Sequence, residues 1–108
     1  MVEQFSKEEN LHIIKEIEMH SDVTQRSLSI KLGISLGKTN YLLRALIKKG
    51  FIEVHNFSDN NGKLKKIQYL LTKNGIEHKM YLMQLYLKEK EVEYFRIKQE
   101  WEQLVVKK

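Results

Sequence analysis

The sequence predicts an α+β fold that is mainly α-helical, with one small β-hairpin and a long C-terminal helix. Three stretches before residue 50 repeat apolar residues with the period of an amphipathic helix. Two later stretches alternate apolar and polar residues around a turn-rich segment, which is typical of a hairpin. After residue 75 the chain has neither proline nor glycine, which favours one uninterrupted final helix.

Composition limits the classes of protein that this chain can form. Its 108 residues fit a single domain with an added element, and the absence of cysteine excludes disulfides and thiolate metal sites. The N-terminal segment is polar and acidic, and no apolar run approaches the roughly 20 residues that span a bilayer. We therefore expect a cytoplasmic protein without membrane contact.

The positive charge is concentrated in the middle of the chain. The net charge is +5, whereas residues 24–75 carry ten basic and two acidic side chains. A basic block of this kind suggests a polyanionic partner, most often nucleic acid. The alternative is a solubilising surface.

Capping signals mark the first three helices. Ser6 and Glu9 form a capping-box pattern, which predicts a helix from Ser6 to about residue 20. Further N-caps are Thr24, before a helix over residues 25–32, and Ser35, before a helix over residues 36–49. The turn between these two helices contains glycine, so the pair has the helix-turn-helix pattern.

The helix over residues 36–49 is predicted to be a recognition helix. Its apolar side and Thr39 follow core spacing, and no acidic residue occurs between Ser35 and Lys49. Long or hydrogen-bonding side chains occupy the other face, where a recognition helix reads base edges: Lys38, Asn40, Tyr41 and Arg44. An adenine edge suits Asn40, and a guanine edge suits Lys38 or Arg44. A plain solvated face is the alternative.

The predicted hairpin has strands over residues 51–57 and 66–71. Its tip and return strand carry Lys63, Lys65 and Lys66. Beside a helix-turn-helix, such lysines are typical of a wing that grips phosphate or the minor groove. They could instead protect an exposed sheet edge against aggregation.

The final helix, capped by Thr72, has the apolar spacing of a coiled coil. Positions that alternate by four and three residues form a seam, which we expect to mediate dimerisation: Ile76, Met80, Met83, Leu87, Lys90, Tyr94, Ile97, Trp101 and Leu104. Lys90 is the one polar member. A second apolar set, Leu82, Leu85, Val92 and Phe95, lies off the seam, so one stripe can pack on the domain and the other on a second subunit.

The sequence offers little for catalysis. Its four histidines are spread along the chain, and no two of them have the i, i+4 spacing of a helical metal site. The five glycines do not form a phosphate-binding loop. We therefore expect neither an enzyme, nor a metal site, nor a cofactor.

Three segments carry a family resemblance: residues 24–38 (TQRSLSIKLGISLGK), residues 41–50 (YLLRALIKKG) and residues 71–75 (LTKNG). They resemble the winged helix-turn-helix of MarR-type bacterial regulators. The run over residues 33–57 is similar to the short MarR-like regulators associated with exopolysaccharide gene clusters. The resemblance implies a homodimeric regulator of transcription that binds double-stranded DNA. By position it assigns base-facing slots to Lys38, Asn40 and Tyr41, and backbone contacts to Thr24, Gln25, Arg26 and Ser35.

The chain departs from the family in two respects. Typical MarR proteins are longer, with a further pair of dimerisation helices around a small-molecule pocket, which leaves an effector open here. The wing has lysines in place of the family's Asp-x-Arg signature. Because lysine is a point charge without the planar fork of arginine, this wing is expected to grip phosphate more than it reads bases.

These observations predict two parts: a winged helix-turn-helix DNA-binding domain over residues 6–74, and a dimerisation element over residues 75–108. The rival hypothesis is a protein-interaction module whose long helix binds a different protein. The operator sequence, the sense of regulation and the relative direction of the paired helices stay open at this stage.

Overall fold

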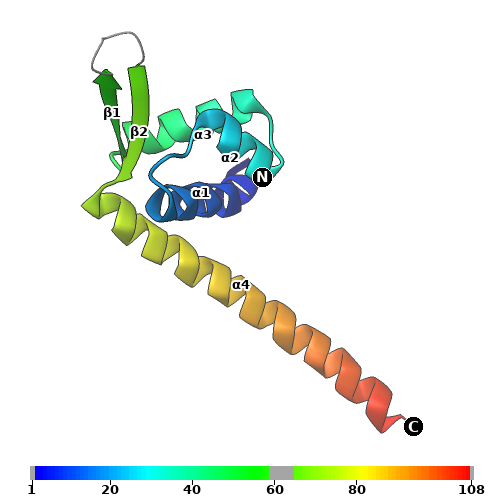
Figure 1. Cartoon of the computed structure of the whole chain (residues 1–108). Helices are drawn as coiled ribbons and strands as arrows, with labels where there is room; N and C mark the ends of the chain where they lie inside the picture. Colours follow the sequence, from blue (N-terminus) through cyan, green and yellow to red (C-terminus); the bar gives the residue numbers. More distant parts are fainter. Residues whose placement is uncertain (1, 59–64, 108) are drawn as a thin grey trace.

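The structure, a computed structural model, describes residues 2–58 and 65–107, with the side chains of residues 7–56 and 67–107. Four helices and two strands follow in the predicted order (Figure 1): α1 (Val2–Met19), α2 (Gln25–Leu32), α3 (Leu36–Lys48), β1 (Ile52–Ser58), β2 (Lys65–Leu71) and α4 (Lys73–Val106). The mainly helical α+β fold is confirmed.

The predicted start of the first helix is wrong. Helix α1 begins at Val2, so Ser6 lies inside the helix and not at an N-cap. Residues 2–5 contain neither proline nor glycine, so nothing in their backbone chemistry stops the helix from starting earlier. A capping-box pattern specifies an end only where the preceding residue leaves helical geometry.

The two caps of the helix-turn-helix are confirmed. Thr24 and Ser27 form a reciprocal capping box at α2, in which each residue's backbone N–H donates to the other's hydroxyl oxygen. Gly33 ends α2 with φ 69°, a left-handed conformation that suits glycine, and its N–H returns to the last turn. The Ser35 hydroxyl then accepts the Lys38 N–H at 3.0 Å and starts α3.

Helix α1 is the centre of the domain, because it lies between α3 on one side and α4 on the other (Figure 1). Side chains from every helix and both strands meet around it in one core: Leu11, Ile13, Ile14, Ile17, Val23, Leu28, Leu42, Leu43, Leu46, Ile52, Tyr69 and Leu82. Thr39 is also buried, and its hydroxyl donates to the Ser35 carbonyl at 2.9 Å. The predicted inward face of the third helix is therefore confirmed.

Strands β1 and β2 form an antiparallel two-stranded sheet, from Ile52 opposite Leu71 to Ser58 opposite Lys65. The alternating pattern produces burial near the helices, where Ile52 and Tyr69 enter the core. Farther along, Ile67 is 51% exposed, because the sheet projects beyond the helices (Figure 1).

A tight junction joins the end of the sheet to α4. The Thr72 hydroxyl accepts the Gly75 N–H at 3.0 Å and donates to the Gly50 carbonyl at 2.6 Å. The Thr72 N–H donates to the Phe51 carbonyl at 3.0 Å. Gly75 packs so closely that a Cβ there would lie 2.1 Å from the Phe51 carbonyl oxygen. The start of α4 is therefore tied to the turn between α3 and β1.

Helix α4 is 34 residues long, as its lack of breakers predicts. Its first half packs on α1 through Leu82 and through an ion pair between Lys79 and Glu18. Its second half leaves the domain and extends the molecule to 74 Å in its longest direction (Figure 1).

Candidate nucleic-acid interface

Helix α3 presents an outward face opposite its buried side. We define this outward face of α3 as Gly37, Tyr41, Arg44 and Lys48, which recur at helical spacing and are all exposed. Tyr41 is 66% exposed, and a Cβ at Gly37 would meet nothing within 4 Å. This face therefore offers an aromatic ring, two cations and a stretch of bare backbone to a partner.

Asn40 and Lys38 flank this outward face on opposite sides. The Asn40 side chain is half-buried. The Lys38 ammonium lies 2.9 Å from Oε2 of Glu9, a mostly buried residue of α1. Of the predicted base-facing residues, Tyr41 and Arg44 thus point outward most directly, whereas Lys38 also ties α3 to α1.

The start of α2 and strand β2 form the two walls of a groove of about 790 Å³ beside α3. Thr24, Gln25 and Arg26 contribute to one wall, and Ile67, Gln68 and Tyr69 contribute to the other, with Leu36 of α3 between them. The Gln25 amide donates to the Tyr69 hydroxyl at 3.4 Å. The structure therefore brings three of the predicted backbone-contacting residues to one groove, next to the first turn of α3.

The remaining predicted contacts divide into two kinds. Ser35 is exposed, but its hydroxyl already caps α3. Lys63 lies outside the described residues, as do the side chains of Lys65 and Lys66, whose backbone begins β2.

Several residues of this surface were absent from the predicted set, among them Gly37, Lys48, Leu36 and Ile67. Gly37 could have been identified from the sequence, because glycine weakens a helix and its presence inside one favours a close approach of the backbone to a partner. Lys48 follows Tyr41 and Arg44 at helical spacing, which predicts that it lies on the same face of α3. Leu36 is 47% exposed and lines the groove, although its apolar character predicts burial.

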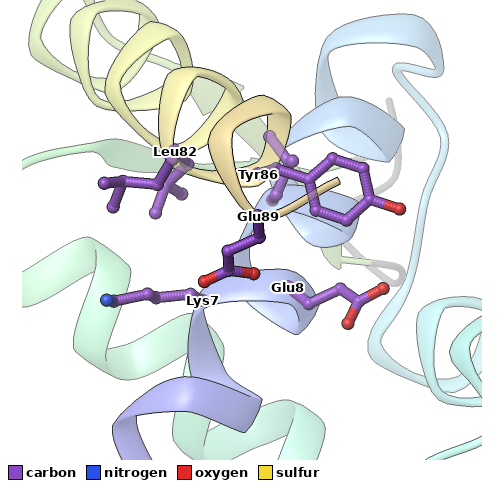
Figure 2. A pocket seen from close by; sticks show the side chains of 7 residues that line it. Lys7, Glu8, Leu82, Tyr86 and Glu89 are labelled. Atoms are coloured by element: carbon purple, nitrogen blue, oxygen red, sulfur yellow. The ribbon is translucent and has the colours of Figure 1, made fainter. Parts of the chain in front are cut away.

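A smaller cavity of about 300 Å³ lies between α1 and α4, on the side of α1 away from α3. Figure 2 shows Lys7 and Glu8 of α1 facing Leu82, Tyr86 and Glu89 of α4. Leu11 and Leu85 complete its lining. Its walls mix apolar side chains with charged ones of both signs, and α1 separates it from the outward face of α3.

His78 of α4 packs beside the junction. Its ring stacks on Phe51 with the ring centroids 4.1 Å apart. Burial lowers the pKa of His78 below its ordinary value, and the nearby Lys49 lowers it further. Both effects favour the neutral imidazole over the charged form.

The described residues contain no group of three or more His, Cys, Asp or Glu side chains placed to hold a metal ion. Within the same part of the chain, none of the helices has both the length and the apolar character needed to cross a bilayer.

The fold and this surface define a winged helix-turn-helix protein. Residues 10–53 match a family model described as winged helix-turn-helix DNA-binding. This segment contains α2, α3 and most of α1, which together build the outward face of α3 and its support. Comparison with curated proteins finds no match.

Solved structures of MarR-type regulators share the arrangement. MarR of Staphylococcus aureus in complex with salicylate and kanamycin has a TM-score of 0.60 and 21% identity, over 81% of this chain and 56% of that one. The S. aureus MepR–DNA complex has a TM-score of 0.59 and 21% identity, over 84% and 65%. AdcR from Streptococcus pyogenes has a TM-score of 0.60 and 17% identity, over 85% and 65%.

These likenesses show the fold: a winged helix followed by a long C-terminal helix, as in MarR-family structures. The chain spans 56% of the MarR chain and 65% of the MepR and AdcR chains. The shared part is therefore the winged helix with one long helix.

Proposed function

We propose that this protein is a homodimeric regulator of transcription that binds double-stranded DNA in a sequence-specific way. The observation that carries the proposal is the outward face of α3, with Tyr41, Arg44 and Lys48 exposed around the bare backbone of Gly37 and no acidic residue along the helix. A helix with these properties suits the major groove, where arginine pairs with guanine edges and backbone can approach closely.

The proposed contacts follow from the placement of the side chains. Tyr41 and Arg44 read bases, with Asn40 and Lys38 at the flanks of the face. Thr24, Gln25, Arg26 and Ser35 hold the DNA backbone beside the groove, because hydroxyls, amides and cations are common phosphate ligands. Lys63, Lys65 and Lys66 of the wing add phosphate contacts, which supply affinity that falls as salt concentration rises.

The proposed organisation has two parts: residues 6–74 bind DNA, and residues 75–108 dimerise. A two-fold dimer places two recognition helices on half-sites about one helical turn of DNA apart. The structure of S. aureus MepR with DNA supports this choice of partner by its fold. From the resemblance to the exopolysaccharide-associated subgroup, we propose exopolysaccharide genes as the targets. We expect the protein to act in the cytoplasm.

Selection from random DNA duplexes, followed by fluorescence-anisotropy titration at two salt concentrations, tests the proposal. We expect enrichment of a two-fold symmetric site that binds at two chains per duplex. Arg44→Ala should lose affinity by roughly 1–3 kcal/mol at one base pair and relax preference there. The matched control is Arg96→Ala, an exposed arginine on α4 far from α3, which should bind as the wild type does.

Two results would contradict the proposal. Selection that enriches no sequence, with equal weak binding to all duplexes, would leave the basic surface as a generic one. Equal effects of Arg44→Ala and Arg96→Ala would remove α3 as the reading element.

A further inference from the structure

The apolar seam of α4 stays uncovered along its whole length. Among its apolar members the exposed fraction ranges from 38% at Met83 to 69% at Leu104. A different stripe of α4 packs on the domain, through the buried residues Gly75 and Leu82. The next residue of that stripe, seven positions on, is the exposed Glu89, so the packing on the domain ends there. Because the seam continues past the domain, its partner must be another helix of similar length, which a second copy of α4 supplies.

Parallel pairing of two copies would place like residues opposite each other. In a parallel coiled coil each seam position faces its own equivalent in the partner. Lys90 would face the partner's Lys90, and Trp101 would face the partner's Trp101. The first pairing sets like charges together in the interface, and the second sets the two bulkiest side chains of the seam in one layer.

The charge on Lys90 is stabilised within its own helix. Its ammonium lies 3.4 Å from Oε2 of Glu93 and 5.4 Å from the centre of the Tyr86 ring. The carboxylate of Glu93, and then Tyr86, raise the pKa of Lys90 above its ordinary value. A partner residue that tolerates a cation therefore suits this layer better than a second lysine does.

Antiparallel pairing supplies such a residue. The seam residues alternate between the a and d positions of a heptad, with Met80, Leu87, Tyr94 and Trp101 at a and Met83, Lys90, Ile97 and Leu104 at d. In an antiparallel pair each a residue faces a d residue of the partner. When the two-fold axis of the pair lies at the level of Val92 along the helix, the layers are Met80 with the partner's Leu104, Met83 with the partner's Trp101, Leu87 with the partner's Ile97, and Lys90 with the partner's Tyr94. Lys90 then meets an aromatic face, and Met83 meets the indole, both favourable contacts.

We propose that two copies of this chain dimerise through an antiparallel pair of α4 helices, with the two-fold axis at the level of Val92 along the helix. This inference rests on the proposed homodimer and adds its direction and register. This register pairs every seam residue from Met80 to Leu104. Sliding one helix by a heptad in one direction leaves Leu104 without a partner layer and sets Lys90 against Leu87.

Distances between single spin labels test the register. The chain has no cysteine, so Lys88→Cys, Gln99→Cys and Glu102→Cys each give one labelled site per subunit. All three positions are exposed and lie on the same side of α4, away from the seam. Their lateral contributions to the label–label distance are therefore alike, so that the axial offset decides the differences.

In the proposed dimer the two labels move apart along the helix axis with distance from Val92. The axial offset is about 12 Å at residue 88, about 21 Å at residue 99 and about 30 Å at residue 102, at 1.5 Å per residue in each helix. Pulsed dipolar spectroscopy of the full chain should give increasing distances in this order.

Two outcomes would overturn the inference, and they differ from each other. Equal distances at all three positions would show a parallel pair, which leaves the proposed regulator intact. A sedimentation mass of one chain with no dipolar coupling would remove the homodimer itself, and the DNA selection would then stand as the separate test of nucleic-acid binding.

Discussion

Gly75 shows how closely the start of α4 approaches the turn between α3 and β1. A Cβ at this position would lie 2.1 Å from the Phe51 carbonyl oxygen and 2.5 Å from Cδ1 of Leu71. We expect Gly75→Ala to lower the free energy of unfolding by about 1–3 kcal/mol. The added methyl group would clash with the backbone of Phe51, which cannot move away without displacing β1. Urea unfolding followed by circular dichroism measures the change.

Gly37→Ala is the matched control, because a Cβ there meets nothing within 4 Å. It should leave stability unchanged or raise it by about 0.5–1 kcal/mol, the usual gain from alanine inside a helix. Equal losses at the two glycines would mean that helix propensity, and not the contact with Phe51, governs Gly75.

His78 gives the fold a dependence on pH. Its pKa is lowered in the folded state, so the unfolded chain binds a proton more readily, and stability is lost as pH falls. The stabilisation is complete above the ordinary histidine pKa of about 6.5 and declines as pH falls through the lowered value.

We expect His78→Phe, which keeps a flat ring against Phe51, to unfold with a weaker pH dependence than the wild type between about pH 7.5 and 5. Urea midpoints at the two pH values measure it. If the variant and the wild type lose stability in parallel, the pH dependence belongs to other groups.

The ion pair between Lys38 and Glu9 couples two elements, the recognition helix and α1. Lys38→Glu places two carboxylates together, so we expect it to lower the free energy of unfolding by roughly 1 kcal/mol, and the added change Glu9→Lys to restore most of that loss. The reversed pair should still bind DNA less tightly, since Lys38 also flanks the outward face of α3. Full recovery of affinity would remove Lys38 from the base-facing set.

Elements with local signals were predictable from the sequence. Thr24, Gly33, Ser35 and Thr72 mark helix ends through contacts within a few residues, and each has its expected role in the structure. The start of α1 was missed because the same local pattern at Ser6 has a continuous helix before it.

The parts that could not be predicted depend on contacts between distant residues. Nothing in the local sequence links Lys38 to Glu9, or Gln25 to Tyr69 across 44 positions. The close approach of Gly75 to Phe51 likewise exists only once the sheet has turned the chain back. Periodicity therefore identified which face of α3 is buried, whereas the neighbours of its flanking residues needed the fold.

At the scale of the whole molecule, the seam of α4 predicts which surface change separates two subunits. Leu87→Asp should convert the dimer to a monomer, because it places a charge in the seam layer. Val92→Asp is the control, since Val92 is also exposed but lies on the opposite side of α4. Sedimentation equilibrium measures the mass, and dissociation by both variants would contradict the seam.

Loss of the dimer should also weaken DNA binding. A monomer reaches one half-site at a time and loses the high effective concentration of the second recognition helix. We expect the Leu87→Asp variant to bind a single half-site as tightly as the wild-type protein does. It should bind the full site far less tightly than the wild-type dimer. Anisotropy titrations with one and two half-sites separate these effects.

Because the junction at Thr72 and Gly75 fixes one end of α4, the length of this helix sets the distance between the two DNA-binding domains of the proposed dimer. Since this helix is hydrogen-bonded to the turn that follows α3, a change in its length changes the position of the reading surface relative to the partner's. In an antiparallel pair, seven residues inserted at Val92 keep every layer of the seam and move the two domains about 10.5 Å farther apart along the helix axis. At 3.4 Å per base pair, that corresponds to an operator whose half-sites are about three base pairs more widely spaced.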